Sequence, residues 1–283
     1  MSAPGAFAPR RILVALDPAG HGSATSDAGA GLAARFSCEL EGLFVEDADL
    51  LRLARSPLAH HVTVPFGVSE PLDTTRVEAD LAARGARARG ALETAARRHG
   101  VRATFRSVRG RAAAELLEAA GVADLLVLGW SSGALSVGGR MGRTARAVLD
   151  RGRASLLLLR RETRIEGPVF AWLEDSPQVA IVAEVAARLA GPEPGRSATL
   201  IVTAPTPEGA FGLRDRIRTH LRGRGEDAVY RSVVAPSALE LGRALAGAEG
   251  GLLVMPAGSG FLGRPSAREL LEELRISLLL LRL

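Results

Sequence analysis

Short apolar runs recur along this chain and alternate with segments whose apolar residues fall at helical spacing. A short apolar run bounded by polar or small residues predicts a strand buried on both faces of a sheet. In the first part of the chain such runs lie at residues 11–17, 40–45, 125–129 and 155–159, and residues 101–108 predict a further strand from their partial alternation. Helical spacing predicts helices over residues 23–36, 76–99 and 113–120, and from Thr144 onward, with Ser23 or Thr25 as the first N-cap. This alternation predicts an α/β protein built on a parallel sheet.

The same order of elements begins again past the middle of the chain. Residues 169–174 repeat the first strand, with Glu174 in the place of Asp17. Residues 277–282 repeat residues 155–160 letter for letter. Internal duplication on this scale predicts two α/β domains in tandem.

A polar stretch between the two copies sets the expected domain limits. It fits a linker, so we expect domains at residues 1–161 and 167–283. In the first copy, Pro and Gly residues interrupt any long element after the second strand, which predicts an inserted lobe at about residues 47–81. The second copy lacks this lobe and is shorter.

A Gly-rich loop follows the run at residues 125–129 and leads into the helix that begins near Thr144. Free backbone N–H groups and a partial positive charge at a helix N-terminus attract anions. Any phosphate that this chain binds is therefore expected at this loop. Gly-rich turns from strand to helix are also common in α/β domains that bind nothing, so the loop alone leaves both interpretations open.

The spacing of the loop glycines resembles the nucleotide loop of the universal stress protein family. That pattern is Gly, two residues, Gly, nine residues, and Gly followed by Ser or Thr. Gly129 and Gly142 match the first and last glycines, Ser132 stands where the middle Gly belongs, and Arg143 stands where the hydroxyl belongs. The resemblance covers nearly the whole chain twice over. It implies two tandem Rossmann-like domains of the adenine nucleotide alpha hydrolase-like type, each a roughly five-stranded parallel sheet with helices on both faces.

The resemblance also implies a ligand, ATP or another adenine nucleotide, in the first domain. In the family an Asp after the first strand holds the ribose and adenine end, and backbone after the second strand contacts the adenine edge. Asp17 and Val45 match those positions, although Asp17 is equally well interpreted as the cap of its own turn. In the second copy Pro256 replaces Gly129 and removes an N–H. The final Ser-Leu run starts 21 residues after Pro256 but 26 residues after Gly129, so we expect no nucleotide in this shorter copy.

Composition and charge narrow the class of partner. The apolar fraction is 47% and the aromatic fraction only 4%, which predicts aliphatic cores. The basic residues are all Arg and are interleaved with Asp and Glu, so the net charge of +5 fits a solvated surface better than a nucleic-acid interface. No run approaches the roughly 20 apolar residues that span a bilayer, and residues 1–11 lack a signal-peptide core. We expect a cytoplasmic protein that binds neither membrane nor nucleic acid.

Candidates for catalysis or metal binding are few. Cys38 is the single cysteine and precedes an apolar run, which predicts a buried residue and no nucleophile. His60 and His61 are adjacent and cannot both face one site from a regular element, so we expect no metal site. The chain has no Walker loop, no Gly-x-Ser-x-Gly elbow and no His-Glu-x-x-His pair. We expect no catalytic residues and at most a weak ATPase activity.

Two classes of function remain. The first is a stress-response binding or regulatory protein that holds an adenine nucleotide without dedicated catalysis. The second is a scaffold without nucleotide that acts through protein partners, and a carrier of a small apolar ligand is a further alternative. The final strands of the two copies are apolar and identical, and an apolar edge strand needs a partner. We therefore expect the two domains to pair within the chain, antiparallel about a pseudo-twofold axis; a homodimer is also compatible with the resemblance.

Overall fold

The structure is a computed structural model of the chain. It describes residues 7–16, 22–56, 60–63, 68–71, 73–131, 141–160, 167–191, 197–223, 228–234, 237–245, 248, 250–273 and 276–283. Asp17 and Ser132 lie outside the described residues.

The first half of the chain folds around five parallel strands. These are β1 (Arg11–Leu16), β2 (Glu39–Asp47), β5 (Ala103–Gly110), β6 (Leu125–Gly129) and β7 (Ser155–Leu159). Their order across the sheet is β5-β2-β1-β6-β7. All residues of β7 are buried, and in β1 only the first residue is not. Burial on both faces explains why β1, β6 and β7 are continuous apolar runs, whereas β5, at the outer edge of the sheet, is partly exposed and carries polar residues among its apolar ones.

The second half repeats this arrangement. Its strands are β8 (Val169–Leu173), β9 (Ala198–Ala204), β10 (Ala228–Val234), β11 (Leu252–Pro256) and β12 (Ser277–Leu281). They lie in the order β10-β9-β8-β11-β12 and are parallel to one another. In each half the strands, counted along the chain, thus follow the order 3-2-1-4-5 across the sheet. The predicted fold of two tandem, mainly parallel α/β sheets is confirmed.

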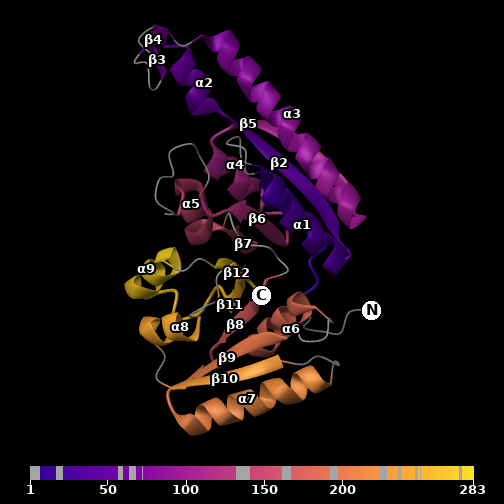
Figure 1. Cartoon of the computed structure of the whole chain (residues 1–283), viewed down its shortest axis with the longest axis vertical. Helices are drawn as coiled ribbons and strands as arrows, with labels where there is room; N and C mark the ends of the chain where they lie inside the picture. Colours follow the sequence, from indigo (N-terminus) through magenta and orange to yellow (C-terminus); the bar gives the residue numbers. More distant parts are fainter. Residues whose placement is uncertain are drawn as a thin grey trace.

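Helices cover both faces of the sheet, and each face has its own apolar core (Figure 1). One core takes side chains from α1 (Gly22–Phe36), α3 (Thr74–His99), α6 (Val179–Ala190) and α7 (Pro207–Arg222). The other takes side chains from α4 (Ala112–Ala119), α5 (Arg143–Arg151), α8 (Ala238–Ala244) and α9 (Pro265–Glu273). Each half therefore contributes two helices to each face. No helix among the described residues is long and apolar enough to cross a membrane.

Additional elements follow β2 in the first half. They are α2 (Ala48–Ala54) and an antiparallel pair of short strands, β3 (His60–Thr63) and β4 (Val68–Pro71), which lie with the start of α3 at one end of the molecule (Figure 1). The hairpin was not predicted from the sequence. In the second half only two residues separate the end of β9 from the start of α7, so nothing equivalent is inserted there.

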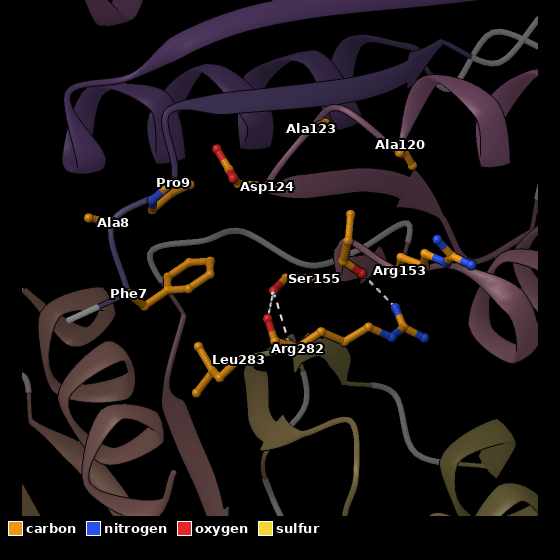
Figure 2. Close-up of a pocket in the computed structure, with 12 residues that line it drawn as sticks. Phe7, Ala8, Pro9, Ala120, Ala123, Asp124, Arg153, Ser155, Arg282 and Leu283 are labelled. Carbon is orange, nitrogen blue, oxygen red and sulfur yellow. Dashed lines mark hydrogen bonds between the residues drawn. The ribbon is translucent and has the colours of Figure 1, made fainter. Parts of the chain in front are cut away.

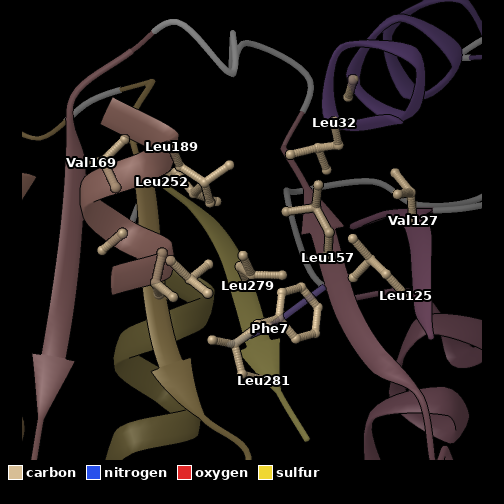
Figure 3. Packing of buried hydrophobic residues seen from close by; sticks show 14 of the residues in the cluster. Phe7, Leu32, Leu125, Val127, Leu157, Val169, Leu189, Leu252, Leu279 and Leu281 are labelled. Carbon is tan, nitrogen blue, oxygen red and sulfur yellow. The ribbon is translucent and has the colours of Figure 1, made fainter. Parts of the chain in front are cut away.

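The two halves join through their last strands. β12 pairs antiparallel with β7, with Leu278 opposite Leu158, Leu279 opposite Leu157 and Leu280 opposite Leu156, and a single ten-stranded sheet results. The predicted antiparallel pairing of the two identical runs is confirmed. Leu157 and Leu279 enter the core on one face, whereas their neighbours enter the core on the other (Figure 3). Both cores thus continue across the seam between β7 and β12, which fixes the halves as one body.

Polar side chains close the seam symmetrically at its two ends. The backbone N–H of Arg160 donates to Ser277 Oγ over 2.9 Å, and that of Arg282 donates to Ser155 Oγ over 3.1 Å. The letter-for-letter repeat therefore supplies the same serine and the same arginine to both ends of one antiparallel pair. A second contact between the halves links Arg35, in the last turn of α1, to two carbonyl oxygens near the end of α6.

The start of α1 differs from its prediction. The helix begins at Gly22, so Ser23 and Thr25 lie inside it and neither is the N-cap. Thr25 lies on the buried side of the helix, where its small side chain fits. The long helix also starts earlier than predicted, at Thr74, because the side chain of Asp73 accepts the N–H of Thr75 and caps it.

Candidate functional site

The carboxyl ends of three adjacent strands bring two of the predicted residues to one edge of the sheet. β1 lies between β2 and β6, with Leu16 opposite Phe44 of β2. Val45 follows Phe44, and Gly129 ends β6. Neighbouring strands are about 4.8 Å apart, so Val45 and Gly129 flank the end of β1 at a separation of about 10 Å. This is the edge at which open α/β sheets bind ligands.

The loop between β6 and α5 is tied together at its base. The N–H of Trp130, directly after Gly129, donates to the carbonyl of Leu159 over 2.7 Å. The carbonyl of Trp130 accepts the N–H of Gly142 over 2.9 Å, so the two ends of the loop are in contact. Gly142 is the N-cap residue of α5 and offers no capping side chain. Arg143, the first residue of the helix, is exposed beside it.

Two of the predicted residues, Asp17 and Ser132, fall outside the described residues, so the structure does not place them. Further along α5 from Arg143, the guanidinium of Arg146 donates to Glu272 of α9 over 2.9 Å. Arg146 therefore has a carboxylate partner in the second half.

Two carboxylates at the same edge have structural partners. Glu46 accepts hydrogen bonds from Ser107 Oγ and from the Arg109 guanidinium, both on β5. Asp47 caps α2 by accepting the N–H groups of Asp49 and Leu50. Glu46 and Asp47 thus hold β5 and α2 in place.

The equivalent edge of the second half is closed by its own carboxylate. Glu174 follows β8 and reaches the loop after β11, where its Oε2 accepts Ser259 Oγ at 2.8 Å and the N–H of Gly260 at 3.1 Å. Its Oε1 accepts the indole N–H of Trp172 at 3.3 Å. The loop from β11 to α9 has eight residues, 257–264, against thirteen, 130–142, from β6 to α5. A short loop whose donors already bind a carboxylate leaves little room for a phosphate.

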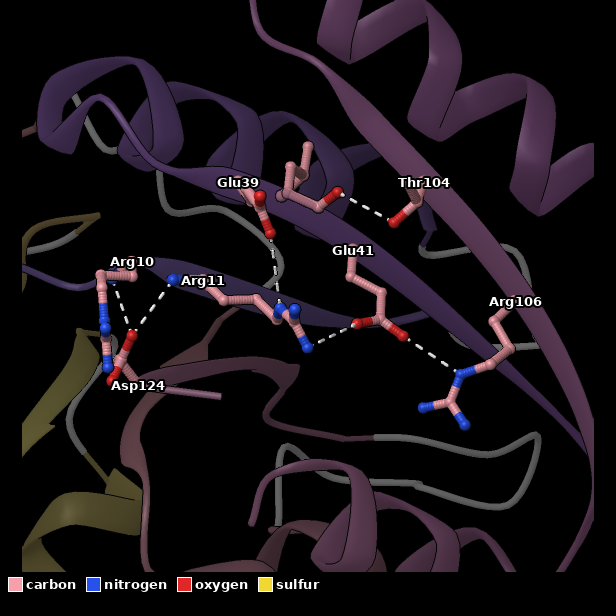
Figure 4. A network of polar contacts seen from close by, with 8 residues as sticks. Arg10, Arg11, Glu39, Glu41, Thr104, Arg106 and Asp124 are labelled. Carbon is pink, nitrogen blue, oxygen red and sulfur yellow. Dashed lines mark hydrogen bonds and ion pairs between the residues drawn. The ribbon is translucent and has the colours of Figure 1, made fainter. Parts of the chain in front are cut away.

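Two cavities lie at the opposite edge of the first half, near the amino ends of its strands. One, of about 300 Å³, lies between Phe7, Asp124, Ser155 and Arg282 at the seam (Figure 2). The other, of about 530 Å³, is lined by charged side chains that pair with one another; Glu41 takes Arg106 at 3.1 Å and Arg11 at 3.9 Å (Figure 4). Neither cavity contains a predicted site residue.

Burial shifts the pKa of three groups, all of them outside the predicted site. Burial raises the pKa of the Cys38 thiol to about 11, and the carboxylates of Asp124 and Glu39 add to the shift. Burial lowers the pKa of Arg160, although nearby Glu272 opposes this, and it also lowers that of Arg282. Among the described residues, no three His, Cys, Asp or Glu side chains form a group that could hold a metal ion.

Sequence reasoning missed one contact beside the loop. The guanidinium of Arg160 lies 3.9 Å from the ring centroid of Trp130, which is only 2% exposed. Trp130 is one of two tryptophans in the chain and stands next to a predicted site glycine. This position in the sequence could have marked Trp130 as a candidate. Its partner Arg160 is 30 residues further along the chain, so the contact could be found only in three dimensions.

Comparison with solved structures finds proteins of similar fold. A universal stress protein from Archaeoglobus fulgidus DSM 4304 matches with a TM-score of 0.67 and 10% identity, over 98% of this chain and 99% of that chain. A functionally unknown protein from Pseudomonas aeruginosa PAO1 matches with a TM-score of 0.58 and 16% identity, over 97% of this chain and 92% of that chain. No protein-family model matches the sequence, and no curated protein resembles it significantly. This chain therefore has the universal stress protein fold along its whole length.

Proposed function

We propose that this chain, with its universal stress protein fold, is a stress-response binding or regulatory protein whose first half binds ATP or another adenine nucleotide. Binding, without dedicated catalysis, is its role. The site comprises Asp17, Val45, Gly129, Ser132, Gly142 and Arg143. We assign residues 1–161 to the nucleotide-binding domain, with its lobe at 47–81, and residues 167–283 to a second domain that binds no nucleotide.

The observation that carries the proposal is the start of α5 at the ligand-binding edge. Some helices have a side chain that accepts their first N–H groups, such as Asp47 at α2 and Thr206 at α7, whereas α4 and α6 lack one, as α5 does. At α5 the N-cap is Gly142, without a side chain, and the first turn contains no acidic residue. Phosphate oxygens are suitable acceptors for such N–H groups. Arg143 adds a positive charge at the same point.

Among the described residues, the strand ends leave space for the rest of the ligand. Apart from its chain neighbours, the only described atom that a Cβ added at Gly129 would meet is the Thr25 methyl group, at 4.0 Å, so no other described side chain lies closely over the end of β6. Beyond Phe44, the side of β2 that faces β1 has no strand partner among the described residues. The backbone N–H and C=O groups at this end of β2, beside Val45, are suited to bind the edge of an adenine ring.

Calorimetric titration of the purified chain with Mg-ATP tests the proposal. We expect a stoichiometry near one nucleotide per chain, because Glu174 and the shorter loop close the second half. Arg143→Ala should weaken binding by about 1.5–3 kcal/mol, the value of a charged hydrogen bond. Arg143→Ser should recover part of the loss by restoring a hydroxyl. Absence of binding, or two equivalent sites, would contradict the proposal.

A scaffold that acts through protein partners is the second candidate, and the edge of the sheet favours it. β10 is an outer strand of the ten-stranded sheet, and its Val229 and Val234 are 51% and 42% exposed. An edge strand with exposed valines can pair with another chain. Sedimentation of the wild type and of Val229→Lys tests whether β10 pairs with another chain. The lysine charge should abolish association through β10, including that of a homodimer.

A further inference from the structure

The last turn of α9, in the second half, contacts two arginines of the first half that lie beside the two ends of the loop that follows β6. At the entry to the loop, Arg160 donates from one guanidinium nitrogen to the carbonyls of Leu271 and Glu272, over 2.8 and 2.6 Å. At its exit, the Glu272 carboxylate accepts Arg146 of α5 over 2.9 Å. One helix end thus holds an arginine on each side of the loop.

At the entry, Arg160 connects this helix end to Trp130. Its guanidinium lies 3.9 Å from the centroid of the indole ring, within the range of a cation–π contact. The backbone of Trp130 is fixed on both sides, by Leu159 over 2.7 Å and by Gly142 over 2.9 Å. Trp130 thus contacts Arg160 through its ring and Gly142, the N-cap residue of α5, through its backbone carbonyl.

The pseudo-symmetric position in the second half lacks this contact. Arg282 donates to the carbonyls of Ala154 and Leu149, over 2.6 and 2.8 Å, and so matches the contacts of Arg160 with α9. Ala257 donates to Leu281 over 2.8 Å and thus takes the place of Trp130. Alanine has no ring on which Arg282 could stack. The backbone contacts are common to both halves, and the stacked ring is present only beside the proposed nucleotide site.

We infer that the second half positions the nucleotide loop of the first half, with Arg160 and Glu272 as the positioning residues. The consequence of the inference rests on the proposed function: the affinity of the first half for nucleotide depends on a domain that does not bind the nucleotide. It gives the second copy a role although its own loop is closed. Because the coupling is an equilibrium one, nucleotide binding also tightens the contact between α9 and α5.

Two matched pairs of variants test the inference in the full chain. Arg160→Gln and Arg282→Gln each remove a guanidinium that bonds two carbonyls across the seam, but only the first removes the contact with Trp130. Glu272→Gln removes the partner of Arg146, and Glu273→Gln changes its exposed neighbour. Arg160→Lys keeps a cation over the ring and is the conservative variant.

The first readout needs no nucleotide. Hydrogen exchange of the Trp130 and Gly142 amides should accelerate about tenfold in Arg160→Gln and in Glu272→Gln, and remain near the wild-type rate in Arg282→Gln and Glu273→Gln. The emission of Trp130, obtained by difference from Trp130→Phe, should change in Arg160→Gln and be partly restored in Arg160→Lys. A loss of seam stability alone would affect Arg160→Gln and Arg282→Gln equally.

The second readout is the affinity for Mg-ATP, which should fall about tenfold in Arg160→Gln and not in Arg282→Gln, since binding must then restore the positions of Trp130 and Gly142. If the wild type binds no ATP, the proposed function is wrong, and exchange and emission still decide the positioning role. Equal exchange of the Gly142 amide in Arg160→Gln and Arg282→Gln would overturn the inference. So would a wild-type rate in Arg160→Gln.

Discussion

Glu174 provides the sharpest test of how the second half is closed. In Glu174→Ala, three donors lose their acceptor: Ser259 Oγ, the N–H of Gly260 and the indole N–H of Trp172. Gly260 is exposed and can bind water instead, so it contributes little. Trp172 is 0% exposed and Ser259 is 7% exposed, and an unsatisfied buried donor costs about 1–3 kcal/mol. We expect Glu174→Ala to lower the free energy of unfolding by about 2–4 kcal/mol.

Urea unfolding followed by tryptophan emission and by far-ultraviolet circular dichroism measures this loss. Glu174→Gln keeps one acceptor oxygen, so we expect it to lose about half as much. Asp175→Asn is the matched control, because Asp175 is the exposed neighbour and pairs with Arg216 at the surface. An exposed pair contributes less than about 1 kcal/mol. If Glu174→Ala unfolds within about 0.5 kcal/mol of Asp175→Asn, the contact of Glu174 with the loop is not the one that stabilises the second half.

Three further experiments test the packing, the thiol and the seam. A Cβ at Gly42 would come too close to the side chain of Leu92, so Gly42→Ala should destabilise by about 1–3 kcal/mol in urea unfolding, whereas Gly90→Ala has open space in α3 and should stabilise by about 0.5–1 kcal/mol. With its pKa raised from 9.0 to about 11, Cys38 should react with a thiol reagent at pH 8 about 100-fold more slowly than an ordinary cysteine, and faster as the pH rises; a rate independent of pH would contradict this. Leu157→Pro removes a backbone donor from the strand between β6 and β12 and should unfold or separate the halves, as gel filtration and circular dichroism would reveal.

Much of the fold could be predicted because its strongest signals are local. Runs such as Leu125–Gly129 are apolar without alternation, and only a strand covered on both faces requires that pattern. The pairing of β7 with β12 could also be predicted, since two identical apolar edge strands are each other's natural partners. Neither inference depends on the details of distant side chains.

Features that depend on contacts between distant residues were not predicted. The hairpin of β3 and β4 has no clear alternation of apolar and polar residues, so its pairing could not be predicted from the sequence. Glu174 was matched to Asp17 by position alone, whereas its contact with Ser259 spans 85 residues. Of the proposed site, the structure brings Val45 and Gly129 to one edge of the sheet, while the roles assigned to Asp17 and Ser132 remain predictions.

The distribution of identity between the two copies has a physical explanation. At the seam each copy contacts the other, so the same serine and arginine meet the same requirement twice, as Arg160 with Ser277 and Arg282 with Ser155 do. At the loops that follow β6 and β11 the copies differ, with Trp130 in one and Ala257 in the other. A seam that both copies must build explains why the serine and the arginine are the same in each, a requirement that does not extend to the first residue of either loop.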